Sequence, residues 1–110
     1  MSRYVFDLDG TLCNNTEGEY QSATPLTNRI NVVNNLYRAG HYIVICTARG
    51  MGRSNNNQEI AQRAWLRMTE EQLGKWGVLY HELHLGKPAG DFYIDDKAIS
   101  DVDFFKQQDI

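Results

Sequence analysis

The sequence predicts an α/β fold of three layers, in which helices cover a mainly parallel sheet. Two observations support this prediction: β-prone runs alternate with segments of helical periodicity, and three of the predicted strands end at a polar residue. A chain of 110 residues has the length of one compact domain. Because no repeat, low-complexity tract or linker divides it, residues 1–110 are expected to form a single domain.

The first half of the chain carries two predicted strands and the helix between them. Residues 4–6 form a short β-prone run that stops at the sequence Asp-Leu-Asp-Gly-Thr. Residues 27–39 place apolar side chains at helical spacing, and Gly40 is suited to end that helix. Residues 41–46 read HYIVIC, an unbroken apolar run typical of a strand buried on both faces of a parallel sheet.

The second half begins with a loop and a helical region. Residues 49–57 are rich in glycine and asparagine and are expected to form a mobile loop. The expected buried stripe of the following helix consists of Ile60, Ala64 and Met68. Residues 69–72 have the sequence of a capping box, so either a second helix begins there or the first one bends. A short helix is expected over residues 98–105.

Two further strands are predicted over residues 82–85 and 91–95. Asp7, Thr47 and Asp95 then all fall at the carboxyl ends of predicted strands. In open α/β sheets, ligands bind in the crevice outside these ends. We therefore expect the three side chains to meet at one site, with the Asp7 strand in the centre and the Thr47 and Asp95 strands on either side.

The segment Asp7-Leu8-Asp9-Gly10-Thr11 is the first candidate for chemistry. In an extended chain, residues i and i+2 point to the same side, so Asp7 and Asp9 can face one reacting group. Gly10 permits a sharp turn that brings backbone N–H groups near an anion. Two carboxylates beside a phosphate need a cation, and an all-oxygen site suits Mg²⁺. Read alone, the segment is equally compatible with a turn that carries two solvated acids. A calcium EF-hand loop does not fit, because its glycine and glutamate positions fall on Leu12 and Gly18.

Three more features follow along the chain. Thr47 ends the second predicted strand, and its hydroxyl can donate to a phosphoryl oxygen. Lys87, in Gly-Lys-Pro, can neutralise a phosphoryl group and the carboxylates around it. Asp95 and Asp96 are adjacent acids that favour a bound cation. Each of these features, taken singly, also describes an ordinary turn or strand end.

Together, and in this order, the four features resemble the four motifs of the haloacid dehalogenase (HAD) superfamily over residues 3–97. The resemblance implies a Rossmann-like HAD core in which Asp7 is the nucleophile and Asp9 the general acid and base. The substrate-binding residues that it implies are Thr47, Ala48, Arg49 and Lys87. The Mg²⁺ ligands that it implies are Asp7, Asp9 and either Asp95 or Asp96. Arg49 and Arg53 flank this site, either as solvated side chains or as substrate contacts, and Arg49 is the better candidate for a contact.

The resemblance also indicates the type of reaction. An acid at Asp9 can protonate a leaving oxygen and then activate water, which favours a phosphatase over the alternative of a phosphomutase. The gaps over residues 12–26 and 49–85 are too short for a large cap domain. Three local features resemble small HAD phosphatases of capsule or sugar biosynthesis and related phage proteins. They are Thr47-Ala48-Arg49 before an Asn-rich loop, residues 80–88 and residues 92–99. We expect a Mg²⁺-dependent phosphomonoesterase that forms an aspartyl-phosphate on a small substrate such as a sugar phosphate. The alternatives are a nucleic-acid 3′-phosphatase and a non-catalytic phosphate-binding or phosphoacceptor module.

Composition narrows the partners and the compartment. Eleven basic and fourteen acidic residues give a net charge of −3, which offers no support for nucleic-acid binding. The apolar runs are too short to span a membrane, and the first strand begins too close to Met1 for a signal peptide. Cys13 and Cys46 do not form a disulfide framework. The expected location is the cytoplasm.

Overall fold

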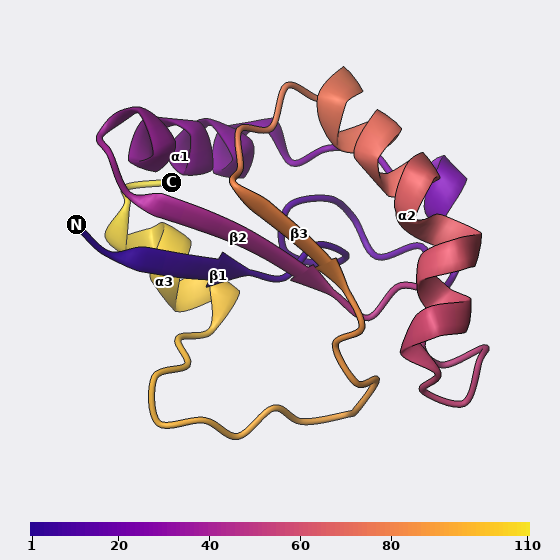
Figure 1. Cartoon of the computed structure of the whole chain (residues 1–110). Coiled ribbons are helices and arrows are strands. Elements are labelled where there is room, and N and C mark those ends of the chain that lie inside the picture. The colour runs from indigo at the N-terminus through magenta and orange to yellow at the C-terminus, as the bar shows by residue number, and fades with distance from the viewer.

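The computed structural model describes all residues 1–110 and contains one sheet of three parallel strands (Figure 1). The strands are β1 (Arg3–Phe6), β2 (Tyr42–Thr47) and β3 (Glu82–Leu85), in the order β1-β2-β3. Phe6 lies beside Ile45, and Thr47 lies beside Leu85. The carboxyl ends of the three strands therefore share one edge of the sheet, as expected for a parallel α/β fold.

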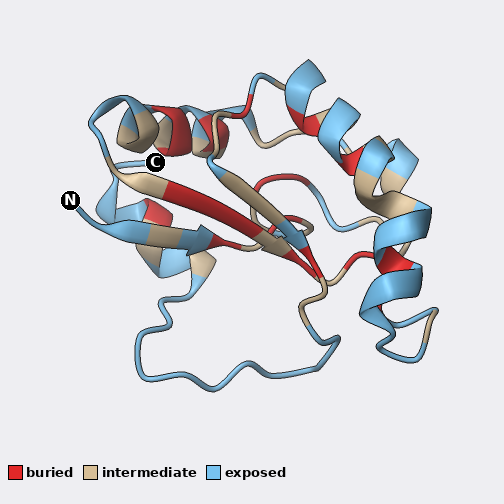
Figure 2. Ribbon diagram, in the orientation of Figure 1, coloured by how far each residue is buried: buried red, intermediate tan, exposed pale blue.

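Three α-helices accompany the sheet: α1 (Thr27–Arg38), α2 (Gln58–Lys75) and α3 (Asp101–Gln107), with a short 3₁₀ helix at Tyr20–Ser22. All three contribute to a single apolar cluster, and the buried segments in Figure 2 lie where helices and strands face each other. The main members of that cluster are Phe6, Ile30, Val33, Ile43, Ile45, Leu73 and Phe105. No large cap domain is present, and no helix combines the length and the hydropathy needed to cross a bilayer.

The predicted strand over residues 91–95 is wrong for this structure. Residues 86–100 form a loop that leaves β3 and, in the view of Figure 1, passes below β1 to reach α3. Phe92 and Ile94 are 85% and 97% exposed. β1 is consequently an edge strand instead of the central one. The consecutive apolar residues 92–94 supplied a strand signal, but strand formation depends on a paired neighbour, which this run does not have.

The helical region after the loop also differs in detail from its prediction. Asn57 caps α2, because its side chain accepts a hydrogen bond from the Ile60 amide at 3.1 Å. The buried positions are Ala61, Thr69 and Leu73, one residue later than the predicted stripe. The helix continues unbroken through the apparent capping box. The Thr69 side chain is buried in the interior and does not cap the start of a second helix. The C-terminal helix exists but begins at residue 101 instead of 98.

Candidate active site

The chain turns sharply as soon as β1 ends. The carbonyl of Leu8 accepts hydrogen bonds from the amides of Thr11, Leu12 and Cys13 at 3.0, 2.8 and 3.3 Å. Gly10 has φ of +85°, a left-handed conformation that glycine adopts without strain. Leu8 and Leu12 are fully buried and anchor this loop in the core. The acids that flank Leu8 are thereby held at the carboxyl edge of the sheet and stay partly exposed.

Asp7 is held from two sides. One carboxylate oxygen, Oδ2, accepts a hydrogen bond from the Thr11 hydroxyl at 2.9 Å. The other, Oδ1, lies 3.4 Å from Nζ of Lys87. The Lys87 amide bonds to the Thr47 carbonyl at 3.3 Å, which ties this lysine to the end of β2. The Asp7 side chain remains 35% exposed, so a ligand can reach it. The structure thus brings together Asp7 and Lys87, as the sequence predicted.

Thr47 and Ala48 lie at the end of β2, beside this loop. Thr47 is 1% exposed, and its hydroxyl oxygen accepts a hydrogen bond from the Arg49 amide at 3.2 Å. The hydroxyl proton is therefore left to donate elsewhere. The Ala48 amide donates to no protein acceptor. Both donors suit an anion at the carboxyl ends of β1 and β2.

Arg49, which the sequence suggested as a substrate contact, does not face the solvent in this structure. Its side chain is 0% exposed, and it forms a two-pronged ion pair with Asp9. Nε donates to Asp9 Oδ2 at 2.9 Å, and Nη2 donates to Asp9 Oδ1 at 3.0 Å. Nη1 donates to the Thr69 hydroxyl at 3.2 Å and to Oε1 of Gln72 at 2.7 Å. These donors are already used inside the protein.

The partners of Arg49 on α2 were not predicted. Thr69 and Gln72 are three residues apart and so lie on one face of the helix. In the sequence they resembled the ends of a capping box, which concealed their role. A polar pair at helical spacing beside apolar neighbours was the available signal.

Cys13 completes the surroundings of Asp9. Its Sγ lies 3.4 Å from Asp9 Oδ1 and 3.8 Å from Nη2 of Arg49. Burial raises the pKa of the Cys13 thiol to about 12; the negative charge of Asp9 adds to this rise, and Arg49 opposes it. The neutral thiol has two acceptors in reach, Asp9 Oδ1 at 3.4 Å and the Leu8 carbonyl at 3.7 Å, and the nearer, negatively charged oxygen of Asp9 favours donation to the carboxylate. Asp9 Oδ1 accepts from two groups, whereas Oδ2 accepts from Arg49 alone.

Arg53 packs against the protein and not against the acids. Its guanidinium carbon lies 5.1 Å from the ring centroids of both Tyr20 and Trp65, and it hydrogen-bonds the carbonyl of Gly18. Next to it, Gly50 has φ of +77°, and a Cβ there would lie 2.5 Å from the Trp65 ring. The loop after β2 therefore packs against α2. Arg53 contacts aromatic rings on the protein surface, whereas Arg49 is buried and paired with Asp9.

Asp95 and Asp96 lie on the exposed loop between β3 and α3. The structure gathers no group of three or more His, Cys, Asp or Glu side chains that could hold a metal ion. It therefore does not bring this acidic pair to Asp7 and Asp9. Two oxygens at the carboxyl end of β1 do suit a hard cation: the partly exposed Asp7 carboxylate, and the Asp9 carbonyl, which accepts no hydrogen bond from the protein. Mg²⁺ commonly uses one or two protein oxygens and retains several waters.

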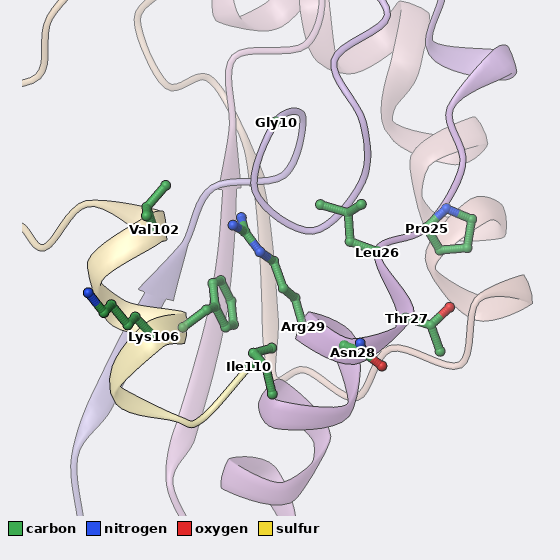
Figure 3. A pocket seen from close by; sticks show the side chains of 10 residues that line it. Gly10, Pro25, Leu26, Thr27, Asn28, Arg29, Val102, Lys106 and Ile110 are labelled. Atoms are coloured by element: carbon green, nitrogen blue, oxygen red, sulfur yellow. The ribbon is translucent and has the colours of Figure 1, made fainter.

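A groove of about 700 Å³ lies between α1 and α3, next to the loop that follows β1 (Figure 3). It reaches the loop only at Gly10, and Arg29 lies in its middle. Arg29 donates to the Thr11 carbonyl at 3.1 Å and to Asp101 at 2.7 Å. Arg29 therefore holds the loop after β1 through the Thr11 carbonyl and links it to α3 through Asp101.

Comparison with known proteins identifies the family. A model of haloacid dehalogenase-like hydrolases matches residues 4–62, more than half of the chain. The chain therefore belongs to the haloacid dehalogenase-like hydrolases, as the motifs indicated. No curated protein matches it.

Similar solved structures include the following three. A target protein from Vibrio cholerae is 34% identical over 94% of this chain and 87% of that chain, with a TM-score of 0.86. A chain of a Pnkp1/Rnl/Hen1 complex is 19% identical over 86% of this chain and 31% of that chain, with a TM-score of 0.58. D,D-heptose 1.7-bisphosphate phosphatase from B. bronchiseptica, solved with magnesium and phosphate, is 16% identical over 100% of this chain and 65% of that chain, with a TM-score of 0.55. The last two resemblances show a shared fold.

Proposed function

We propose that this hydrolase cleaves phosphomonoesters through a covalent aspartyl-phosphate on Asp7. One observation carries the proposal: the Asp7 carboxylate is oriented by Thr11, faced by the Lys87 ammonium and still 35% exposed. Its placement at the carboxyl edge of the sheet is where α/β enzymes bind ligands. The cationic Lys87 and the free donors of Thr47 and Ala48 suit the three outer oxygens of a phosphoryl group.

The proposed reaction has two steps. Asp7 attacks phosphorus, the bond to the leaving oxygen breaks, and Asp9 gives that oxygen a proton. Asp9 then takes a proton from water as the water oxygen attacks phosphorus, which releases inorganic phosphate and restores the Asp7 carboxylate. Asp9 is 18% exposed and lies two residues from Asp7, so it can serve both steps.

The proposed cofactor is Mg²⁺, held by the Asp7 carboxylate, the Asp9 carbonyl and a carboxylate of Asp95 or Asp96. When bound, the ion supplies positive charge that offsets the phosphoryl oxygens. The exposed loop has to carry the acidic pair toward Asp7 for this ligand set to form. Asp91→Asn, on the same loop, is the matched control for Asp95→Asn and Asp96→Asn.

Calorimetric titration with Mg²⁺ should show weaker binding in at least one of the two acidic-pair variants and unchanged binding in the control. Hydrolysis should stop in excess chelator, and Ca²⁺ should suppress it because its looser shell mispositions the nucleophile. Equal Mg²⁺ binding by all three variants would remove the acidic pair from the ligand set.

We propose a small phosphorylated metabolite, such as a sugar phosphate, as the substrate, and the cytoplasm as the compartment. The net charge of −3 gives no electrostatic support for binding a nucleic-acid strand and so favours a small ligand. The absence of a large cap leaves the site open to either kind of substrate. A panel of phosphorylated metabolites and a 3′-phosphorylated oligonucleotide, offered to the purified protein, compares the two classes directly.

Multiple-turnover release of phosphate from an aryl phosphate tests the activity itself. Wild type should turn over many times, and Asp7→Asn should fall to background because the attacking carboxylate is gone. Asp109→Asn, an exposed acid at the other end of the chain, should retain full activity. Release of no more than one phosphate per protein molecule would favour a phosphoacceptor module instead.

A further inference from the structure

Arg49 is a buried charge whose hydrogen bonds all stay within the protein. The guanidinium meets Asp9 along one edge, with N–O distances of 2.9 and 3.0 Å. Its remaining N–H groups point to Thr69, Gln72 and the Cys13 sulfur. A planar guanidinium that forms two parallel hydrogen bonds fixes both the position and the plane of a carboxylate.

The orientation of Arg49 is itself set by other elements. Gln72 accepts from Nη1 at 2.7 Å, and its own amide donates to the Tyr20 carbonyl at 2.9 Å. The Tyr20 ring centroid lies 5.0 Å from the guanidinium carbon. The Arg49 amide also bonds to the hydroxyl of Thr47, one of the proposed phosphate donors. Arg49 therefore links α2 and the short 3₁₀ helix at Tyr20–Ser22 to the loop after β1 that carries Asp9.

We infer that Arg49 is a positioning residue for Asp9, and that it leaves Oδ2 as the oxygen that carries the transferred proton. This inference rests on the proposed function, because it assigns how the proposed acid and base is held. Oδ1 accepts from both Arg49 and Cys13, whereas Oδ2 accepts from Arg49 alone and retains a free lone pair. Arg49 itself touches no substrate, since its side chain is 0% exposed.

Lysine at this position would keep the positive charge and lose the two-pronged geometry. The nucleophile would be unaffected, because Asp7 is held by Thr11 and Lys87. Protonation of the leaving oxygen needs an aligned acid, and it matters most when the leaving group is basic. Arg49→Lys should therefore damage reactions in proportion to the basicity of the leaving group. A residue that only stabilises the fold would lower all rates alike.

The experiment compares kcat/KM of wild type and Arg49→Lys on aryl phosphates of graded phenol pKa and on one alkyl phosphate. We expect a loss of about 10²-fold for the alkyl phosphate, the scale of general acid catalysis, and little loss for the most acidic phenol. Arg63→Lys, an exposed arginine on α2 paired only with Glu59, is the control and should match wild type on every substrate.

Two outcomes would overturn the inference: no loss on any substrate, or the same loss on all of them. If Arg49→Lys does not fold, Gln72→Leu replaces it, because that change removes one support of Arg49 and keeps both charges. It should produce the same dependence on the leaving group with smaller losses, and a uniform effect there would also overturn the inference. Failure of the proposed function is recognised separately, as wild type and Asp7→Asn releasing phosphate at the same rate.

Discussion

Replacing Thr69 by valine removes one hydroxyl and leaves the size and helix propensity of the side chain nearly unchanged. In the wild type that hydroxyl is fully buried and accepts a hydrogen bond of 3.2 Å from Nη1 of Arg49. A hydrogen bond to a charged group contributes about 1.5–3 kcal/mol. Because Nη1 also donates to Gln72, we expect the lower part of that range, about 1.5–2 kcal/mol.

Thr69→Ser is the matched control. It keeps the hydroxyl and removes a buried methyl group, which costs about 1 kcal/mol. Urea unfolding with linear extrapolation should therefore rank the free energy of unfolding as wild type, then serine, then valine. For a chain of this length, about 2 kcal/mol lowers Tm by roughly 8 °C. A valine variant as stable as the serine variant would show that Arg49 does not use this hydroxyl, and would refute the buried network around Asp9.

Three further predictions concern stability. Asn34→Ala should cost about 2 kcal/mol in urea unfolding, because its buried carboxamide makes hydrogen bonds of 2.9 and 2.8 Å to the loop between α2 and β3; a loss below about 0.5 kcal/mol would contradict those bonds. Gly50→Ala should lower Tm clearly, since its φ is +77° and a Cβ would lie 2.5 Å from the Trp65 ring, whereas Gly52→Ala meets nothing and should be neutral. Burial raises the pKa of the Cys13 thiol from 9.0 to about 12. Above pH 9 the thiol ionises in the unfolded chain before it ionises in the folded protein. The free energy of unfolding should therefore fall as the pH rises from 9 to 12. Cys13→Ala should flatten that fall when unfolding midpoints are compared at about pH 8 and about pH 11, and an identical pH dependence in both proteins would contradict the burial.

The sheet and the core of the site were predictable because their signals are local. Each strand that formed ends where a run of β-prone residues meets a turn, as at Asp7 and Thr47. Parallel strands align such ends, so the approach of Lys87 to Asp7 followed from the order of elements despite the distance along the chain.

The remaining features depend on which groups meet in space. Residues 91–95 have a strand-like pattern, but whether such a run forms a strand depends on pairing with a neighbour. The stripe of α2 was displaced by one position because periodicity defines a helical face only within a residue or so. Arg49 looked like a substrate contact because it follows Thr47, and only the fold shows that α2 supplies acceptors that turn it inward.

The central claim, that Asp7 carries the phosphoryl group, is tested most directly by trapping the intermediate. Asp9→Asn retains the nucleophile and removes the base that activates water, so the covalent intermediate should accumulate. Intact-mass spectrometry of Asp9→Asn after an activated aryl phosphate and Mg²⁺ should show the added mass of one phosphoryl group. The double variant Asp7→Asn/Asp9→Asn should show none, and peptide mapping should place the modification in the segment that contains Asp7. The same added mass in the double variant, or its location on another residue, would contradict the account.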